Sequence, residues 1–349
     1  MKVINYYKIL VLRVYVLYRI KCSLQRIILG RCKSKIDDQK NDKSVKINFV
    51  IGEYRGWILE GIIDEIIKYM PANYSCTKSY QLDALQDSDL YFFVHYQLYH
   101  KYMAFGDKYV NPKKCLIWFT HPNNNINFSH KSLIYSLNRV GIIFATCSMW
   151  KDKLLEHNIA DTKISVSIGG ADENAFTNGS EKSRTVIISS AYYERKNPKV
   201  IQELIENSKD VNFIILGRNW EKYQGFNDLL ACRNLRYLDV AYSEYPQYYR
   251  SASVYLSLSN MEGGPIPLIE AMMSNLIPVV TDTGFAKDVI IDGRNGLIID
   301  LSELSIELIQ RKIEIAFNMQ FDNRTYTMDN YSWSAFSNGI FSSIESLLK

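Results

Sequence analysis

Several residue patterns that would define a class of protein are missing from this sequence. No run of about 18 uncharged apolar residues occurs, so we expect no helix that spans a membrane. The six cysteines are scattered along the chain, without a CxxC pair or the spacing of metal ligands. We therefore expect reduced thiols in a cytoplasmic compartment and no disulfide framework.

Motifs of other common enzyme classes are missing as well. The chain has no GxGxxG after its first apolar run, no P-loop, no GxSxG nucleophile elbow and no HExxH. Dinucleotide-dependent, P-loop, serine-hydrolase and zinc-peptidase chemistries are therefore not indicated.

Positive charge is concentrated at one end of the chain. Residues 1–46 contain 12 Lys and Arg and 3 Asp, a net charge of +9, whereas the remainder carries −5 within an overall charge of +4. Because the body is not basic, we expect no nucleic-acid partner. The 349 residues and the 47% hydrophobic content are those of a globular protein with room for two domains.

The basic end predicts a segment at a membrane surface. Residues 1–35 mix Ile, Leu, Val and Tyr with basic residues in a loosely amphipathic helical pattern. Such helices lie in the interface of anionic membranes, so we expect this segment to hold the protein at the inner face of the cell membrane. The alternative is a helix packed on the first domain with its charges in water. Residues 33–46 are polar and indicate a linker.

From residue 45 onward, short apolar runs alternate with helical segments. The runs of the first half are residues 45–51, 89–96, 114–121, 141–148 and 162–170. Those of the second half are residues 184–191, 211–217, 235–240, 253–259, 277–281 and 296–300. This pattern predicts two doubly wound α/β units, divided near residues 171–183, with parallel sheets that are covered on both faces. Ligands are expected in a cleft between the carboxyl ends of the two sheets.

The most informative segment is SNMEGGPIPLIEAMMSNLIPVVTDTG, residues 259–284. Glu262 precedes a loop, and Glu270 lies about one turn inside the helix that follows, where Pro267 suits the first turn. Free N–H groups at a helix start attract phosphate, so both carboxylates are expected to border a phosphate-binding pocket. The alternative is a buried connection with two solvated glutamates. The loop and helix start contain Gly263, Gly264, Pro265 and Ile266.

Two histidines end apolar runs of the first half. His95 and His121 each fall at the carboxyl end of an expected strand, which is the edge where open α/β sheets bind ligands. The alternative for each is a hydrogen-bonded histidine of the core.

A basic pair and a glycine follow strands of the second half. Arg195 and Lys196 come just before the expected helix start at Asn197-Pro198 and predict an anion site, with a solvated charged turn as the alternative. Gly217 ends the next apolar run and predicts a tight turn at the same edge.

In order and spacing these segments resemble the retaining family-4 glycosyltransferases of the GT-B fold. Glu262-Gly-Gly-Pro-Ile-Pro-Leu-Ile-Glu270 is similar to the Glu-x7-Glu motif of that family. The other matching segments are LIWFTHP, IFATCSMWKDKLLEHNI, KISVSIGGADENAF, TGFAKDVIIDGRNGLIID and NYSWSAFSNGIFSSIESLLK. The resemblance covers roughly residues 45–349.

The resemblance implies two Rossmann-like domains that face each other across a cleft. It implies an acceptor domain over residues 45–175, a nucleotide-sugar domain over 176–325, and a C-terminal helix over 326–349 that crosses back to the first domain. The tail and linker, residues 1–44, precede these domains.

Family roles follow for the matched residues. The loop amides of residues 263–266 would cradle the nucleotide diphosphate, and Glu270 would accept hydrogen bonds from the ribose hydroxyls. Glu262 would face hydroxyls of the transferred sugar, and Arg195 with Lys196 would stabilise the departing diphosphate.

Two positions depart from the family pattern. The family's arginine falls at Ser190 or Ala191 and is absent, so the resemblance leaves open whether Arg195 takes its place. In the first-domain loop Gly56 stands where many members have two glycines. Gly56 and Gly217 are both expected to contribute to donor binding.

The implied reaction is transfer of a sugar, with retention at the anomeric carbon, from a nucleotide-diphosphate donor to a hydroxyl of a glycan or lipid-linked glycan. His121 would orient donor and acceptor. The donor is a substrate, and neither a cofactor nor a metal ion is expected. The residue composition suggests bacterial surface-polysaccharide synthesis, such as that of lipopolysaccharide. Alternatives are a non-catalytic GT-B scaffold that partners another glycosyltransferase, and a sugar-nucleotide epimerase of similar fold.

Overall fold

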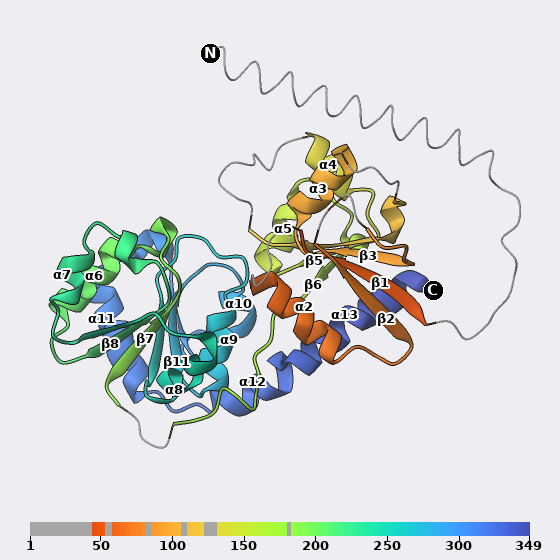
Figure 1. Ribbon diagram of the computed structural model, residues 1–349. Helices are drawn as coiled ribbons and strands as arrows, with labels where there is room; N and C mark the ends of the chain where they lie inside the picture. Colours follow the sequence, from red (N-terminus) through yellow and green to blue (C-terminus); the bar gives the residue numbers. More distant parts are fainter. Residues whose placement is uncertain are drawn as a thin grey trace, which may run out of the picture. The chain divides into compact units, whose positions relative to one another are not determined.

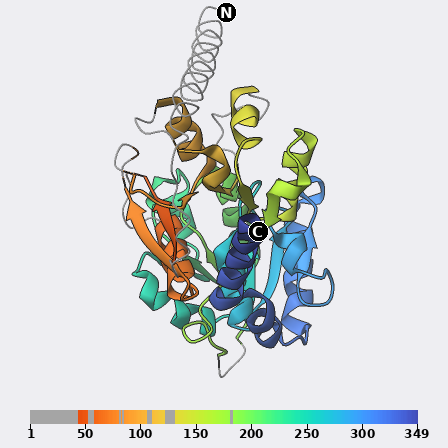
Figure 2. The same ribbon diagram turned by 90° about the vertical axis from the view of Figure 1, so that its right-hand side faces the viewer.

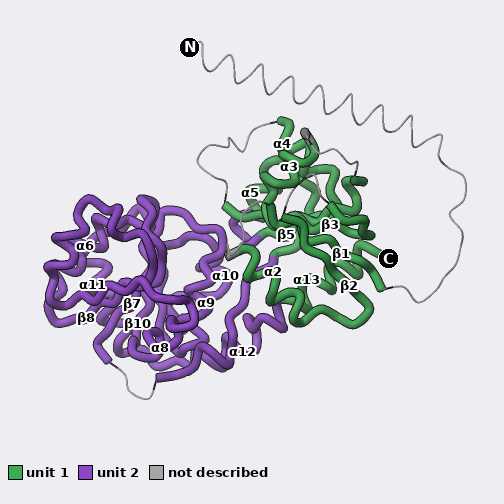
Figure 3. Tube along the Cα trace, in the orientation of Figure 1, with its two compact units in different colours: residues 1–145, 151–166, 337–349 green, residues 146–150, 167–336 purple. Residues whose placement is uncertain are grey.

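The computed structural model describes most of the chain after the basic tail. The described residues are 44–52, 58–80, 82, 85–105, 110–121, 131–179 and 183–349. The predicted membrane segment and Gly56 lie outside them. The described residues form two compact units (Figure 3): unit 1 holds the chain up to residue 145, residues 151–166 and residues 337–349, and unit 2 holds residues 146–150 and 167–336.

Unit 1 is built on a six-stranded parallel sheet with the order β2-β1-β3-β4-β5-β6 (Figure 1). Its strands are β1 (Val45–Val50), β2 (Tyr74–Ser79), β3 (Leu90–Phe93), β4 (Cys115–Phe119), β5 (Ile142–Ala145) and β6 (Ile164–Val166). The helices of this half are α2 (Ile58–Lys68), α3 (Tyr96–Phe105), α4 (Lys131–Leu137) and α5 (Ser148–Glu156).

The interior and the edge of this sheet differ in sequence. Every residue of β3, β4 and β5 is buried, because helices cover both faces, and the strands therefore appear as continuous apolar runs. The apolar runs do not predict β2, whose residues YSCTKS are mostly polar and partly exposed. As an edge strand β2 pairs only with β1, so it needs no apolar run.

The C-terminal helix α13 (Trp333–Leu348) ends in unit 1. Figure 2 shows it in dark blue, running to the C terminus. The Ser337 hydroxyl donates to the carbonyl of Ile66 in α2 at 3.0 Å, and the Phe341 ring lies 4.8 Å from the Tyr74 ring. The later part of α13 therefore packs on α2 and on the start of β2.

Unit 2 repeats the architecture with the strand order β12-β11-β10-β7-β8-β9, again all parallel. Its strands are β7 (Thr185–Ser189), β8 (Asn212–Leu216), β9 (Leu235–Leu238), β10 (Val254–Ser257), β11 (Ile277–Thr281) and β12 (Leu297–Ile299). Its helices are α6 (Pro198–Asn207), α7 (Phe226–Leu230), α8 (Tyr245–Arg250), α9 (Ile266–Met273), α10 (Ala286–Val289), α11 (Ile306–Asn318) and α12 (Asn323–Tyr331). The two doubly wound units that the sequence predicts are thus confirmed.

Amphipathic helices cover each face of the second sheet. The apolar sides of α6 and α11 pack with alternate residues of β7, β8, β10 and β11 into one core, which includes the buried Trp220. Helices α8 and α9 lie on the opposite face (Figure 1), and α9 is almost entirely buried. Because α9 is buried, its single acidic residue, Glu270, is also buried.

The passage from unit 1 to unit 2 falls at residues 166 and 167, earlier than the expected boundary at residues 175 and 176. Residues 171–176 belong with unit 2 because they bind its last helix. Ala171 forms a bridge with Ser332, and the Arg324 guanidinium donates to the carbonyls of Phe176 at 2.5 Å and Glu173 at 2.8 Å.

We predict that Arg324→Met lowers the free energy of unfolding by about 2 to 4 kcal/mol, because charged hydrogen bonds to carbonyls are lost without replacement. Arg324 also donates to the carbonyl of Met273 at 2.9 Å, so the substitution loosens α9 as well as residues 173–176. Denaturant unfolding of the full chain is the measurement. The exposed Arg311 on α11 is the matched control, and Arg311→Met should change stability by less than about 0.5 kcal/mol. Equal effects of the two substitutions would contradict the role of Arg324.

Candidate functional site

Two loops of unit 2 meet at the carboxyl edge of its sheet. β7 and β10 are neighbours in the strand order, and residues 190–197 and 258–265 follow them. Parallel strands end at one edge, so these loops lie side by side. The Asn260 N–H donates to the Arg195 carbonyl at 2.8 Å, which ties one loop to the other.

A pair of asparagine side chains reinforces this joint. Asn197 has left-handed backbone angles, with φ of 55°. Its amide donates to the Leu258 carbonyl and to the Asn260 side chain, both at 2.7 Å, and the Asn260 amide donates back at 2.8 Å. The segment that carries the basic pair is therefore held rigidly against the segment that leads to Glu262.

Glu262 is buried between two cations. Its side chain accepts a hydrogen bond from Arg195 Nη1 at 2.9 Å on one oxygen and from Lys196 Nζ on the other, and only 6% of the residue is exposed. Arg195 also donates to the Met261 carbonyl at 2.7 Å. Burial by itself would raise the pKa of Glu262, but the charges of Lys196 and Arg195 outweigh it and lower the pKa to about 2. The cluster of two cations and one carboxylate keeps a net charge of +1.

Side chains from outside the motif hold the loop after Glu262. Thr146 donates to the Gly263 carbonyl at 2.9 Å, and the Trp150 indole donates to the Glu262 carbonyl at 3.1 Å. Both belong to unit 2, although the sequence places them in the first half of the chain. Gly284 closes the other side of Glu262: its φ is +58°, and a Cβ there would lie 2.9 Å from that of Glu262.

The rest of the predicted loop leads directly into helix α9. Gly264 lies against the Phe285 ring, which a Cβ on the glycine would approach to 3.0 Å. Pro265 is the residue before the first turn, and Ile266 is the first helical residue and is buried. The helix therefore begins where Pro267 predicts that it should.

Glu270 is buried in a different environment. Only 2% of it is exposed, and it accepts hydrogen bonds from two phenols, Tyr249 at 3.0 Å on Oε2 and Tyr242 on Oε1. Burial raises the pKa of Glu270 to about 7, although both phenols act to lower it. The two motif glutamates, eight positions apart, thus differ in their response to pH.

Four side chains that hold the two glutamates or the loop after Glu262 are not predicted from the sequence: Thr146, Trp150, Tyr242 and Tyr249. Tyr249 lies in a segment that the sequence identifies only as a helix. No spacing rule connects a helix after β9 with Glu270. Only the sheet order, which brings these elements together, identifies the two phenols.

The predicted histidine of unit 1 lies after β4. His121 is half-buried, and its charge acts on His95, which follows β3. Burial, and then the charge of His121, lower the pKa of His95 to about 4. The Gln97 N–H donates to Nδ1 of His95 at 3.2 Å, which leaves the proton on Nε2, 3.3 Å from the Thr120 hydroxyl. His95 is thus a neutral, hydrogen-bonded histidine.

Gly217 lies at the end of β8, on the same edge of the unit 2 sheet as the two loops. Its φ is +148°, and a Cβ would come within 2.2 Å of the Ser190 carbonyl oxygen, so a side chain there would displace the loop after β7. Its amide donates to the Leu238 carbonyl at 2.9 Å. Gly217 therefore joins the ends of three neighbouring strands.

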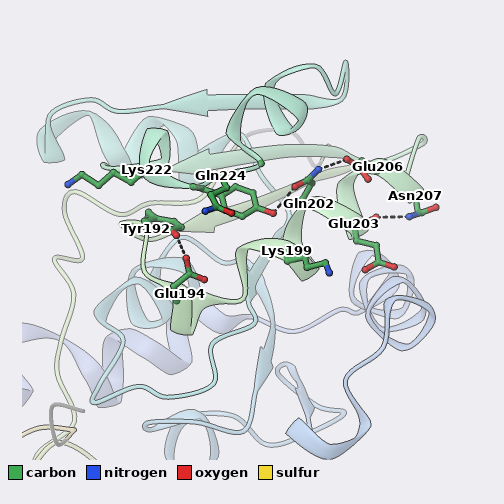
Figure 4. A pocket seen from close by; sticks show the side chains of 11 residues that line it. Tyr192, Glu194, Lys199, Gln202, Glu203, Glu206, Asn207, Lys222 and Gln224 are labelled. Atoms are coloured by element: carbon green, nitrogen blue, oxygen red, sulfur yellow. Dashed lines mark hydrogen bonds between the residues drawn. The ribbon is translucent and has the colours of Figure 1, made fainter. Parts of the chain in front are cut away.

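An open pocket of about 1060 Å³ lies elsewhere on unit 2, beside α6 (Figure 4). Its side chains bind one another: Gln202 donates to Glu206 at 2.7 Å, and Tyr192 donates to Glu194. The residues that line it include none of those that the sequence predicts for the site.

The described part of the chain shows neither a metal-binding cluster nor a membrane-spanning helix. There, no group of three or more His, Cys, Asp and Glu side chains has an arrangement that could hold a metal ion. Among the same residues no helix is both long enough and apolar enough to cross a membrane.

Comparison with protein-family models finds a match in the second half of the chain. Residues 171–332 match the family model of the glycosyl transferases group 1. No curated protein matches the sequence.

Solved structures resemble the chain over most of its length. HepE of Anabaena in complex with UDP has a TM-score of 0.68 at 13% identity, over 86% of this chain and 100% of that one. The lipopolysaccharide outer core galactosyltransferase WaaB has a TM-score of 0.64 at 14% identity, over 86% and 99%. A glycosyltransferase of Rickettsia africae has a TM-score of 0.66 at 14% identity, over 88% and 99%.

These likenesses confirm the two-domain α/β fold of the GT-B type. Together with the family match over residues 171–332, they support a glycosyltransferase.

The cluster around Glu262 predicts a response to acid. Because its folded pKa of about 2 lies below the ordinary value of 4.5, ionised Glu262 stabilises the fold above pH 4.5 and loses that effect as the pH falls toward 2. We expect Glu262→Gln to lower the free energy of unfolding at neutral pH by about 3 kcal/mol, because two partly buried cations lose their charged partner. The difference from the unaltered protein should shrink below about pH 4.5.

Denaturant titrations across this pH range measure the effect. Glu303 is exposed, so Glu303→Gln serves as the control and should follow the unaltered protein at each pH. A deficit of Glu262→Gln that stays constant down to the lowest pH would contradict the ion cluster.

Proposed function

We propose that this protein transfers a sugar from a nucleotide-diphosphate donor to a hydroxyl of an acceptor. The observation that carries the proposal is the joint placement of two buried glutamates, a basic pair and a glycine loop at one sheet edge. That edge is where doubly wound sheets bind nucleotides. HepE has been solved in complex with UDP and with UDP-glucose, which supports a nucleotide-sugar donor here.

Each side chain has a part in this proposal. Ionised Glu270 accepts hydrogen bonds from ribose hydroxyls, and the N–H groups of Gly263, Gly264 and Ile266 approach the diphosphate at the start of α9. Lys196 and Arg195 retain one positive charge beyond that which Glu262 neutralises, and this charge stabilises the departing diphosphate. Glu262, in this proposal, accepts a hydrogen bond from a hydroxyl of the transferred sugar.

We further propose that the reaction proceeds with retention at the anomeric carbon. The leaving diphosphate takes the proton of the acceptor hydroxyl on the same face of the sugar, so no carboxylate nucleophile is needed, unlike in two-carboxylate glycosidases. His121 orients donor and acceptor. The anomeric configuration of the product, determined by NMR, tests this step.

The proposed acceptor is a glycan or a lipid-linked glycan of a bacterial surface polysaccharide. The similarity to WaaB, a lipopolysaccharide outer core galactosyltransferase, supports this class of acceptor. The absence of the family's arginine at Ser190 and Ala191 favours a second candidate, a non-catalytic scaffold for another glycosyltransferase. The scaffold would release no nucleotide from any donor. An epimerase would instead interconvert its sugar nucleotide without an acceptor.

We predict different kinetic effects for the two glutamates. Glu270→Ala should weaken donor binding roughly tenfold to a hundredfold, since a charged hydrogen bond is worth about 1.5–3 kcal/mol. Glu262→Ala should lower turnover more than it raises KM, because the contact that Glu262 makes is tied to the reacting sugar.

Lys196→Ala or Arg195→Ala should lower turnover by about 100-fold or more if that residue stabilises the leaving diphosphate.

Nucleotide release from UDP-, GDP- and ADP-sugars, with calorimetric titration of donor binding, measures these effects. Lys222→Ala, an exposed lysine outside the site, is the control. Full rate and affinity in both glutamate variants would refute the proposed donor site. Small, equal effects of the two cation variants would show that neither stabilises the leaving group.

We also propose that residues 1–35 bind the inner leaflet, where a lipid-linked acceptor would be encountered. Attraction to anionic lipid is worth about 1 kcal/mol per basic residue near the surface. The intact chain should therefore sediment with phosphatidylglycerol vesicles at low salt but not at high salt. Deleting residues 1–35 should abolish sedimentation and leave donor binding unchanged, and phosphatidylcholine vesicles are the control. Equal sedimentation of the two chains would contradict this proposal.

A further inference from the structure

Glu270 has one buried partner and one exposed partner. Tyr249, which is fully buried, donates to Oε2 from within the unit. Tyr242 donates to Oε1, yet 57% of Tyr242 is exposed. One carboxylate oxygen of a residue that is only 2% exposed is therefore bound by the hydroxyl of a residue that is itself exposed.

The segment that carries Tyr242 lies at the surface of unit 2. It is a single 3-10 turn, η5 (Tyr242–Glu244), after the edge strand β9, and residues 241–244 are all exposed. The turn is closed by its own bonds: the Glu244 N–H donates to the Ala241 carbonyl at 2.9 Å, and the Ala241 N–H donates to the Glu244 side chain at 3.3 Å. The Tyr242 ring lies beside that of Tyr245, with 5.3 Å between centroids, and beside that of Phe176, with 6.2 Å.

We propose that the Tyr242 hydroxyl is a placeholder, which occupies Glu270 Oε1 in the free protein and gives way to a ribose hydroxyl of the bound nucleotide. This inference rests on the proposed function, since it takes Glu270 as the ribose carboxylate. A buried carboxylate oxygen without a partner is costly, so a solvent-facing hydroxyl that fills the place keeps the empty site intact. The exchange replaces one hydroxyl donor by another.

The exchange predicts a coupling between a protein hydroxyl and a ligand hydroxyl. When a deoxynucleotide binds to the unaltered protein, Tyr242 stays on Glu270, so the missing ribose hydroxyl costs little affinity. In Tyr242→Phe nothing can take its place, and the same ligand leaves Oε1 buried without a partner. We expect 2′- or 3′-deoxygenation to raise the Kd by less than about fivefold in the unaltered protein. In Tyr242→Phe the ratio of the deoxynucleotide Kd to the ribonucleotide Kd should be about ten times larger than in the unaltered protein.

Calorimetric titration of the full chain tests the coupling, in buffer well above the Glu270 pKa of about 7 so that the carboxylate is ionised. UDP, GDP and ADP are compared first, and the tightest is then measured against its 2′-deoxy and 3′-deoxy forms. Tyr245→Phe is the matched control, because this neighbouring phenol lies within range of the Glu270 charge and should leave the deoxy penalty as in the unaltered protein.

The outcomes separate this proposal from the proposed function. If none of the three nucleotides binds, the nucleotide-sugar function is refuted, and the placeholder with it. If nucleotides bind and the deoxy penalty is equal in the unaltered protein and in Tyr242→Phe, the function stands and the placeholder is refuted. Weaker binding of ribo- and deoxynucleotides by the same factor would assign Tyr242 a purely structural role and would also refute it.

Discussion

The ion cluster of Glu262 with Lys196 and Arg195 is the interaction on which the organisation of unit 2 depends. It joins the loop after β7 to the loop after β10, and the bonds from Thr146 and Trp150 fix the same segment from the other side. Removing Glu262 would leave two partly buried cations without a counter-charge, which is more costly than losing a surface ion pair. The backbone of the glycine loop is positioned by the same contacts.

The two motif glutamates show how environment divides the work of identical side chains. Glu262, between two cations, has its pKa lowered to about 2 and stays ionised at any physiological pH. Glu270 faces only phenols, and burial raises its pKa to about 7. A carboxylate with that pKa changes charge near neutrality, so a ligand that needs its ionised form would bind more tightly as the pH rises through 7. Glu262 is therefore ionised at every physiological pH, whereas Glu270 changes charge near neutral pH.

The two basic residues of the site are adjacent in the sequence but bind Glu262 separately. Arg195 and Lys196 are consecutive, yet each reaches a different oxygen of Glu262, because the Asn197–Asn260 joint and the short 3-10 turn before α6 hold the backbone in place. Arg195 also donates to the Met261 carbonyl, whereas the Lys196 ammonium donates to Glu262. A compact pair on one turn therefore provides two positive charges at the sheet edge.

The sequence by itself determined the alternation of strands and helices, the division into two units, and the candidates at strand ends. Buried parallel strands require continuous apolar runs, and the Glu-Gly-Gly-Pro segment has a distinctive local pattern. The polar edge strand β2 left no such pattern. Only the tertiary structure decided which side chains hold the two glutamates: Thr146, Trp150, Tyr242 and Tyr249 come from distant segments, and strand order rather than spacing along the chain brings them together. The opposite pKa shifts of Glu262 and Glu270 arise from those partners, so they too were decided by the fold.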